Sequence, residues 1–283
     1  MLATLDSLLD LGFDTADQAR RFLDWRDHKA YTPNRDCAFD IGGATGRALA
    51  RLRVGVSPEE AGDDPDAFGN GSLMRILPIA LVDPTLATAE LVAWAHRSSR
   101  ITHGASTSLA ACALYVLAAR RLLDGERDRT AALAVATRAL RGEYRRTGDV
   151  ALADALEALL AWPGREGRGH VSDSFWSAWD AFEGADDYRS AVIRAVRYGN
   201  DTDTTAAIAG GLAGLYFGET DIPADWRHNL RGPEISGPLV NRLARRLDAS
   251  REPRLPEMDP DYPYSTDDVE RIHDYQEWHR LHR

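Results

Sequence analysis

Hydrophobic residues recur at helical spacing along most of the chain. Leu2, Leu5, Leu8 and Leu9 form one apolar stripe, and the run 105–123 predicts a long, largely buried helix. No segment shows the strict alternation of apolar and polar residues that marks a half-buried strand. Further helices are predicted after Asp14, around 86–94, and near 129–141, 149–161, 172–182, 187–198, 203–217, 238–247 and 267–281. The pattern predicts a compact, single-domain, all-α protein.

The two ends of the chain differ from its middle. The first stripe starts at Leu2 with no Ser, Thr, Asp or Asn ahead of it to cap a helix. We therefore expect either a frayed first turn or residues of the same fold that belong before Met1. At the other end, prolines predict that a helical domain over 1–250 is followed by a Pro-rich linker and an amphipathic helix over 251–283. There the string 265–268, Ser-Thr-Asp-Asp, is interpreted as a helix cap.

Composition narrows the class of protein. Of the 283 residues 44% are hydrophobic, and the net charge of −10 argues against a nucleic-acid-binding surface. The two cysteines, Cys37 and Cys112, are far apart, which favours buried reduced thiols over a disulfide or a zinc site. No apolar run approaches the roughly 18 residues of a membrane span, and no signal peptide opens the chain. We expect a cytoplasmic protein without membrane partners, and the Ala- and Arg-rich composition suggests a bacterial source.

The most informative segment is 198–211, Tyr-Gly-Asn-Asp-Thr-Asp-Thr-Thr-Ala-Ala-Ile-Ala-Gly-Gly. Asp201, Asp203 and Thr204 place oxygen donors at the start of a helix of small residues, and such donors suit Mg²⁺ or Mn²⁺. The alternative is an ordinary Asp cap. These side chains supply fewer than the roughly six ligands of Mg²⁺, and two cations about 4 Å apart would require more bridging carboxylates. At most one cation is expected on this motif alone.

This segment resembles the C-terminal metal motif of the ADP-ribosylglycohydrolase family, which includes dinitrogenase reductase-activating glycohydrolase. Other stretches are similar to that family in order and spacing: Phe39-Asp40-Ile41-Gly42 followed by Ala48-Leu49, Gly69-Asn70-Gly71-Ser72-Leu73-Met74-Arg75, Ile101-Thr102-His103, and Ile222-Pro223-Ala224-Asp225-Trp226. The resemblance runs from the first residues to about 247. It implies an orthogonal helical bundle that hydrolyses the bond between ADP-ribose and a protein side chain or small acceptor.

The resemblance also implies roles for individual residues. The metal ligands are Asp201, Asp203 and Thr204; the catalytic carboxylates are Asp203 and Asp40; the substrate-binding residues are Phe68, Gly69, Asn70, Gly71, Ser72 and His103. In the family two Mg²⁺ or Mn²⁺ ions bind at each site, and a Thr-Asp-Asp element ahead of the first helix supplies the other half of their ligands. This chain begins where that element would have ended, so a truncated or mis-started chain with impaired activity is expected.

Each of these residues also has a simpler interpretation. Asp40 would hold the turn at Gly42 by side-chain hydrogen bonds, and Gly69-Asn70-Gly71 would be an ordinary turn rather than a phosphate loop at a helix start. Ser72 would cap that helix, Phe68 would belong to the core, and His103 would be structural. Arg75 is interpreted as an ion-pair partner. The alternatives to an enzyme are a non-catalytic ADP-ribose-binding or regulatory protein, and a truncated chain that does not fold stably.

Overall fold

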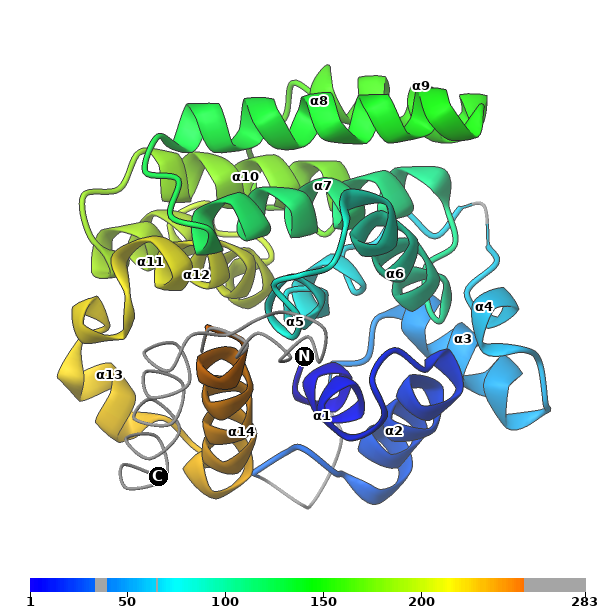
Figure 1. Cartoon of the computed structure of the whole chain (residues 1–283). Helices are drawn as coiled ribbons and strands as arrows, with labels where there is room; N and C mark the ends of the chain where they lie inside the picture. Colours follow the sequence, from blue (N-terminus) through cyan, green and yellow to red (C-terminus); the bar gives the residue numbers. More distant parts are fainter. Residues whose placement is uncertain (34–39, 65, 252–283) are drawn as a thin grey trace, which may run out of the picture. The chain divides into compact units, whose positions relative to one another are not determined.

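Figure 1 shows the computed structural model of the chain, which describes residues 1–33, 40–64 and 66–251. Within these residues all regular structure is helical, apart from one isolated bridge between Gly69 and His170. The helices are α1 (Leu2–Leu11), α2 (Thr15–His28), α3 (Gly43–Arg53), α4 (Pro58–Ala61), the 3₁₀ turn η1 (Leu73–Arg75), α5 (Pro78–Leu81), α6 (Thr88–Arg100), α7 (Ser106–Leu123), α8 (Arg129–Thr147), α9 (Val150–Leu160), α10 (Val171–Glu183), α11 (Tyr188–Val196), α12 (Thr202–Phe217), the 3₁₀ turn η2 (Glu219–Asp221), α13 (Ala224–Asn229) and α14 (Pro233–Arg251). The predicted all-α class is confirmed.

Residues Met1–Leu247 form one compact unit, and the description below concerns that unit. The predicted linker and terminal helix at 251–283 lie outside the described residues, except that residue 251 ends α14. Cys37 and Phe39 also lie outside them. Cys112 is buried as a free thiol, as expected.

Helix α7 is the central element of the core. It contacts α5, α6, α8, α9, α10 and α12, and its residues from Ser108 to Arg120 are all buried. By length and composition α7 is apolar enough to span a membrane, which corrects the expectation that no apolar run is this long. However, 78% of this stretch is buried inside the fold. The apolar character is therefore explained by helices on every side of α7.

Helix α12 packs closely against α7 because its residues are small. A Cβ atom at Gly211 would lie 2.7 Å from the Tyr115 Oη atom of α7, which is closer than van der Waals contact allows. Tyr115 in turn donates a hydrogen bond of 3.0 Å to the Ile208 carbonyl of α12. This close packing fixes the position of the first turn of α12, where the predicted metal ligands lie.

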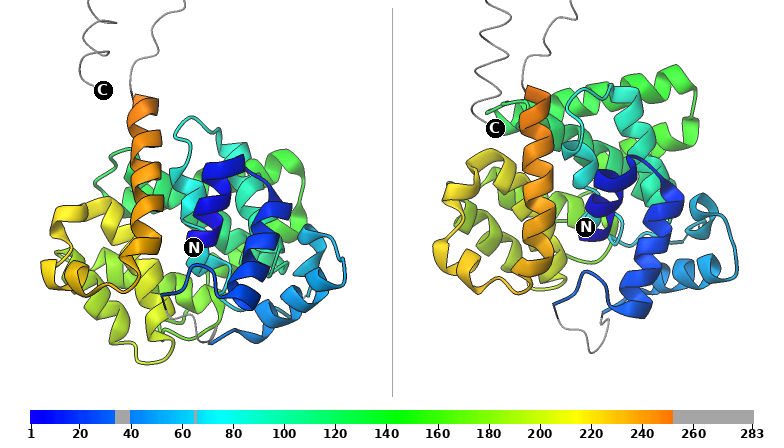
Figure 2. Two further views of the ribbon diagram at one scale, coloured as in Figure 1. Left: turned by 90° about the horizontal axis from the view of Figure 1, so that it is seen from below. Right: turned by 60° about the horizontal axis from the view of Figure 1, so that its bottom comes forward.

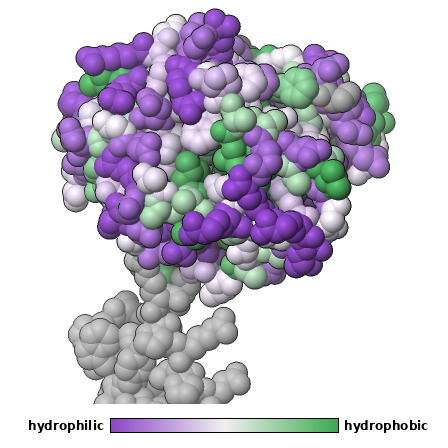
Figure 3. Space-filling view, turned by 90° about the horizontal axis from the view of Figure 1, so that it is seen from above, coloured by the Kyte–Doolittle hydropathy of each residue, from purple (hydrophilic) through white to green (hydrophobic). Residues whose placement is uncertain are grey.

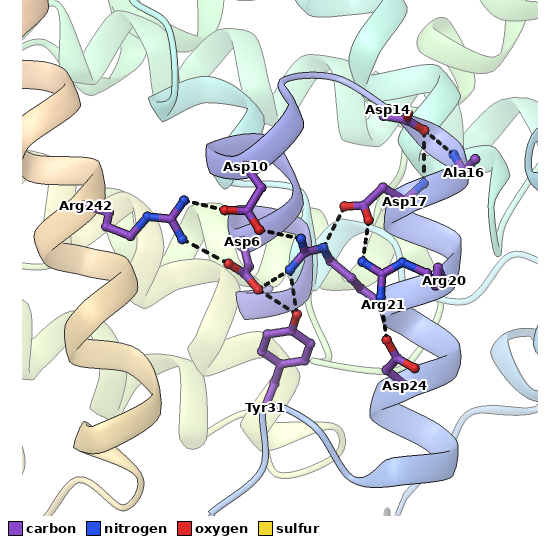
Figure 4. Close-up of polar contacts among 10 residues, drawn as sticks. All are labelled: Asp6, Asp10, Asp14, Ala16, Asp17, Arg20, Arg21, Asp24, Tyr31 and Arg242. Carbon is purple, nitrogen blue, oxygen red and sulfur yellow. Dashed lines mark hydrogen bonds and ion pairs between the residues drawn. The ribbon is translucent and has the colours of Figure 1, made fainter.

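An ionic cluster joins α1 and α2, which follow each other in the sequence, to α14, which begins more than 200 residues later (Figure 4). In both views of Figure 2, α14 lies beside α1. The guanidinium of Arg21 on α2 binds Asp6 and Asp10 of α1, and Arg242 of α14 binds the same two carboxylates. Helix α1 itself begins without a side-chain cap, as its sequence predicts. These ion pairs, together with the apolar contacts of Leu5 and Leu8, hold α1 in the unit.

Large hydrophobic side chains that remain exposed are scattered over different elements. Leu11, Val54, Val150 and Leu230 are the most exposed of them among the described residues. In the view of Figure 3, hydrophobic residues form small separate patches among hydrophilic ones. That face of the described unit shows no extended apolar area of the kind that marks a large interface.

Candidate functional site

One cavity of about 620 Å³ collects most of the residues that the sequence singled out. Its wall combines the start of α1, part of α2, the turn before α3, the loop 69–71 with η1, the turn after α6 and the start of α12. The predicted residues in this wall are Asp40, Gly69, Asn70, Gly71, His103, Asp201, Asp203 and Thr204. The fold thus brings together segments separated by more than a hundred residues.

The three predicted metal ligands lie at the first turn of α12. Asp201 occupies the N-cap position, but its side chain makes no capping hydrogen bond. Asp203 is exposed, and the Thr204 hydroxyl lies 3.8 Å from the Met74 sulfur. The alternative of an ordinary Asp cap is therefore not what the geometry shows, and all three oxygen-bearing side chains face the cavity.

Asn70 orients Asp201 by direct hydrogen bonding. Its Nδ2 atom donates one hydrogen bond of 2.7 Å to Asp201 Oδ2 and another of 2.8 Å to the Ser174 hydroxyl. The Ser174 hydroxyl in turn donates a hydrogen bond of 2.7 Å to the Arg168 carbonyl. Asn70 was predicted to bind substrate; the structure gives its amide nitrogen the additional role of holding a carboxylate in place.

The loop 164–169 holds the backbone of Asp201, and the sequence analysis did not predict this loop as part of the site. The Asp201 backbone N–H donates to the Gly167 carbonyl at 2.7 Å. The loop is itself held by Asp173, which is 3% exposed and accepts the Arg168 N–H at 2.7 Å. Gly167 has a φ of +66°, and a Cβ there would lie 2.6 Å from the Cβ of Tyr198. The signal for this loop was the presence of three glycines within the six residues 164–169, about 30 positions before the acidic motif.

The loop 69–71 passes directly over the edge of the His103 ring. A Cβ at Gly69 would lie 3.2 Å from His103 Nε2, and one at Gly71 would lie 2.9 Å from His103 Cε1. The Asn70 N–H already donates to the Gly169 carbonyl at 3.1 Å, so it is not available to a phosphate. The element that follows, η1, is a three-residue 3₁₀ turn and not the expected α-helix. It therefore provides little of the helix-dipole field that the prediction assumed.

Phe68 and Ser72, which were predicted to bind substrate, are not among the described residues that line the cavity. The Phe68 ring is 38% exposed and stacks on His170, which stacks on Trp162 at 4.4 Å. Ser72 is fully buried, and its hydroxyl accepts a hydrogen bond of 2.9 Å from Ser99. Ser72 makes no side-chain cap. The structure thus places Ser72 in the packing behind the loop, where a ligand would not reach it.

The cavity wall also carries aromatic side chains that were not predicted as site residues. Phe22, Trp25 and Tyr31 line the cavity, as does Asp40. The Tyr31 hydroxyl donates to Asp6 at 2.7 Å (Figure 4), and burial together with this bond raises the pKa of Tyr31. Asp40 is exposed and has a φ of +52°, a left-handed conformation that Asp tolerates better than most residues. An aromatic and acidic wall of this kind suits a cationic or planar group.

The cavity wall carries charges of both signs. Asp201 and Asp203 line it, and so does Arg75. No carboxylate within the described residues pairs with Arg75, so the expectation of an ion pair is wrong. Burial lowers the pKa of Arg75 to about 10, which leaves it charged at neutral pH. Burial and the charge of Arg75 lower the pKa of His103 to about 3, so this ring is neutral.

The donor set fits a single hard cation. Two carboxylates and a hydroxyl are the oxygen ligands that Mg²⁺ and Mn²⁺ prefer. Among the residues that the structure describes, no three His, Cys, Asp or Glu side chains come together as a metal-binding group. A cation bound here would therefore complete its coordination with water or with ligand oxygens.

Comparison with known proteins agrees with this geometry. The model of the family described as ADP-ribosylglycohydrolase matches residues 1–256. The chain belongs to the ADP-ribosylglycohydrolase family. This confirms the resemblance found in the sequence.

Individual relatives are similar over most of this chain. It is 30% identical over 276 residues to "ADP-ribosylarginine hydrolase Tri1" of Pseudomonas putida, covering 91% of this chain and 66% of the relative. It is 29% identical to "ADP-ribosyl-[dinitrogen reductase] glycohydrolase" of Rhodospirillum rubrum, covering 77% of this chain and 66% of the relative. A solved structure titled "ADP-ribosylglycohydrolase-related protein complex" matches with a TM-score of 0.68 and 32% identity, covering 87% of this chain and 78% of that one. The chain thus spans about two thirds of the length of these two curated relatives.

Proposed function

We propose that this chain hydrolyses the glycosidic bond between ADP-ribose and a protein side chain, with a divalent cation held by Asp201, Asp203 and Thr204. Membership of the family supports the reaction class. The names of two relatives, an ADP-ribosylarginine hydrolase and a glycohydrolase of ADP-ribosyl-[dinitrogen reductase], make protein-linked ADP-ribosylarginine the first substrate to assay.

One observation carries the proposal. The carboxylate of Asp201 makes no helix-capping hydrogen bond. It accepts a hydrogen bond from Asn70 instead, and it lines the same cavity as the glycine loop and His103. An Asp side chain that served only as an N-terminal helix cap would accept hydrogen bonds from backbone N–H groups of the first turn. This arrangement leaves the Asp201 carboxylate facing the cavity, beside Asp203.

The chemistry requires stabilisation of an oxocarbenium-like ribose and delivery of water to its anomeric carbon. When bound, a divalent cation supplies positive charge that orients water and the ribose hydroxyls. The proton of the attacking water passes to a carboxylate, and Asp203 and Asp40 are our candidates, since both line the cavity and both are exposed. Asp40, which lines the same cavity as Trp25 and Tyr31, also suits contact with a guanidinium leaving group.

The test is an assay of ADP-ribose release from an ADP-ribosylarginine peptide with and without Mg²⁺. Asp203→Asn should lower the rate by about 10²–10⁴-fold, the range for loss of a general base. Asp154→Asn, an exposed carboxylate on α9, is the matched control and should have no effect. Release that is unchanged in Asp203→Asn, or unchanged by a chelator, would refute the proposal.

We also propose that the donors at α12 form one half of a two-cation site. Within the described residues only two carboxylates meet there, which is fewer than two cations require. Met1 and Leu2 line the same cavity, so a Thr-Asp-Asp segment joined ahead of Met1 would enter it. We expect low activity from the 283 residues alone and higher activity when such a segment is attached. Equal activity of the two proteins would refute the half-site.

The small number of carboxylates also favours a second candidate function, a non-catalytic ADP-ribose-binding or regulatory protein. Calorimetry separates the two. ADP-ribose binding without turnover, retained in Asp203→Ala, would support the binding protein and refute the hydrolase.

A further inference from the structure

The buried side chain of Arg75 belongs to the cavity wall and has no carboxylate partner among the described residues. The side chain is 7% exposed, and its Cζ atom lies 4.6 Å from the centre of the Phe22 ring. Its Nη2 atom donates to the Ser98 carbonyl at 3.0 Å and to the Thr102 hydroxyl at 2.7 Å. A buried cation needs compensation, and here two neutral oxygens on Nη2 and the face of the Phe22 ring provide part of it. Arg75 is thus fixed in one position with its charge directed toward Thr102.

Thr102 connects Arg75 to His103. The Thr102 oxygen accepts the Arg75 hydrogen bond and lies 2.9 Å from His103 Nδ1, and both residues are only 2% exposed. A guanidinium can only donate, and a hydroxyl has one hydrogen of its own. If the hydroxyl gives that hydrogen to Nδ1, both contacts of the Thr102 oxygen are accounted for, while Arg75 Nη1 has no hydrogen-bond partner among the described residues. The neutral ring must then carry its hydrogen on Nε2.

The Nε2 edge of His103 faces the cavity. The loop 69–71 crosses this edge, and the absence of a Cβ at Gly69 leaves room next to Nε2. No hydrogen-bond partner of Nε2 occurs among the residues that the structure describes. An N–H group in such a sheltered position requires an acceptor, because an unpaired donor loses its hydration without replacement.

We infer that Arg75 is a positioning residue which, through the Thr102 hydroxyl, fixes His103 as the Nε2–H tautomer and thereby makes it a permanent hydrogen-bond donor to an oxygen of the ligand. The identity of that oxygen, a phosphate or ribose oxygen of ADP-ribose, rests on the proposed function; the tautomer does not. His103 then binds and orients the ligand and takes no part in proton transfer. An isolated histidine would instead populate both tautomers and titrate near neutral pH.

The tautomer is measured on the ligand-free chain by long-range ¹H–¹⁵N spectra of its histidine rings, with His103→Gln to assign the signals. We expect a neutral Nε2–H pattern for His103 that is constant from pH 5 to 8. Thr102→Val, which removes the hydroxyl at similar size, should convert it to a mixture of tautomers, and Thr102→Ser should restore it. Thr137→Val is the matched control, because that hydroxyl donates to the Leu133 carbonyl within α8.

Binding of ADP-ribose by calorimetry is the second measurement. Thr102→Val should weaken it about tenfold, the effect of one misdirected hydrogen bond, and Thr102→Ser should bind like the original chain. An Nδ1–H or protonated His103 in the original chain, or an unchanged spectrum in Thr102→Val, would overturn the inference. The predicted tautomer with no binding of ADP-ribose would refute the proposed function and leave the relay from Arg75 to His103 supported.

Discussion

Asn70 and Asp201, 131 positions apart in the sequence, are joined by a hydrogen bond of 2.7 Å from the amide nitrogen to a carboxylate oxygen. The bond links the glycine loop to the first turn of α12, and both residues line the cavity. It fixes the direction in which one carboxylate oxygen points, and this is what a residue behind a metal ligand does in metalloproteins.

Replacement of Asn70 by Ala should weaken cation binding although Asn70 is not among the predicted ligands. Removal of an outer partner of this kind commonly lowers metal affinity about 10–100-fold, and calorimetry with Mg²⁺ or Mn²⁺ would measure it. Asn229→Ala is the control, since its amide donates to the Asp225 carbonyl on α13. Equal affinities of both variants would show that Asn70 does not orient Asp201.

Arg21 should be essential for stability. Its side chain is 9% exposed and pairs with Asp6, Asp10 and Asp17. Arg21→Ala removes the buried guanidinium that these carboxylates share, although Arg242 still pairs with Asp6 and Asp10 and Arg20 still pairs with Asp17. It should lower the free energy of unfolding by about 3 kcal/mol, the lower end of the range for a broken buried ion pair.

The adjacent Arg20 provides the comparison for that change. Its side chain is 58% exposed and pairs with Asp17 and Asp24 (Figure 4). Arg20→Ala should cost at most about 1 kcal/mol, as exposed pairs do. Urea unfolding of both variants tests the difference, and a loss of similar size in the two would contradict the account of this cluster.

The small residues of α12 should be needed for packing rather than for helix formation. Gly211→Ala would place a methyl group 2.7 Å from Tyr115 Oη and 2.9 Å from Leu77 Cδ2. The crowding should destabilise the fold by about 1–3 kcal/mol. Gly142→Ala, inside α8 with nothing within 4 Å, should instead stabilise it by about 0.5–1 kcal/mol. Thermal melts that shift in the same direction for both would refute this interpretation.

His96 should make the stability depend on pH. Burial, followed by the charge of Arg100, lowers the pKa of His96 to about 4, and its Nε2 lies 3.0 Å from the Tyr144 hydroxyl. Below the unfolded value of about 6.5 the unfolded chain binds a proton that the folded chain does not. The contribution of His96 is therefore complete above about pH 6.5 and declines as the pH falls toward 4, by up to about 1.4 kcal/mol per pH unit.

Urea unfolding at several pH values between 4 and 7 measures this dependence. His96→Gln should flatten the curve relative to the original chain. His228→Gln, an exposed histidine on α13, should leave it unchanged. A curve that His96→Gln does not alter would contradict the predicted neutral state of this ring.

Sequence periodicity predicted the long helices because each buries one regular stripe. Predicted boundaries at 149–161 and 203–217 differ from α9 and α12 by only a residue. The segment 129–141 was too short by six residues, since α8 continues to Thr147. Helices α4 and α5 have four residues each, which is about one turn, and so they show no period to detect.

The candidate site was predictable where a local pattern carried the chemistry. Asp201, Asp203 and Thr204 stand together in the sequence, so their common position follows from one helix start. The partners of Asp201 were not predictable from a local pattern, because the loop 164–169 meets Asp201 only through tertiary packing and is itself held by Asp173. Ser72 was misplaced for a related reason: the turn after it is a 3₁₀ turn, which directs its hydroxyl toward Ser99 and away from the cavity.

The most direct test of the account is Mn²⁺ binding to the chain, followed by electron paramagnetic resonance. We expect one Mn²⁺ per chain, with binding abolished in Asp201→Asn and in Asp203→Asn and retained in Asp154→Asn. Binding that is undiminished in the double variant Asp201→Asn, Asp203→Asn would contradict a cation site at the start of α12.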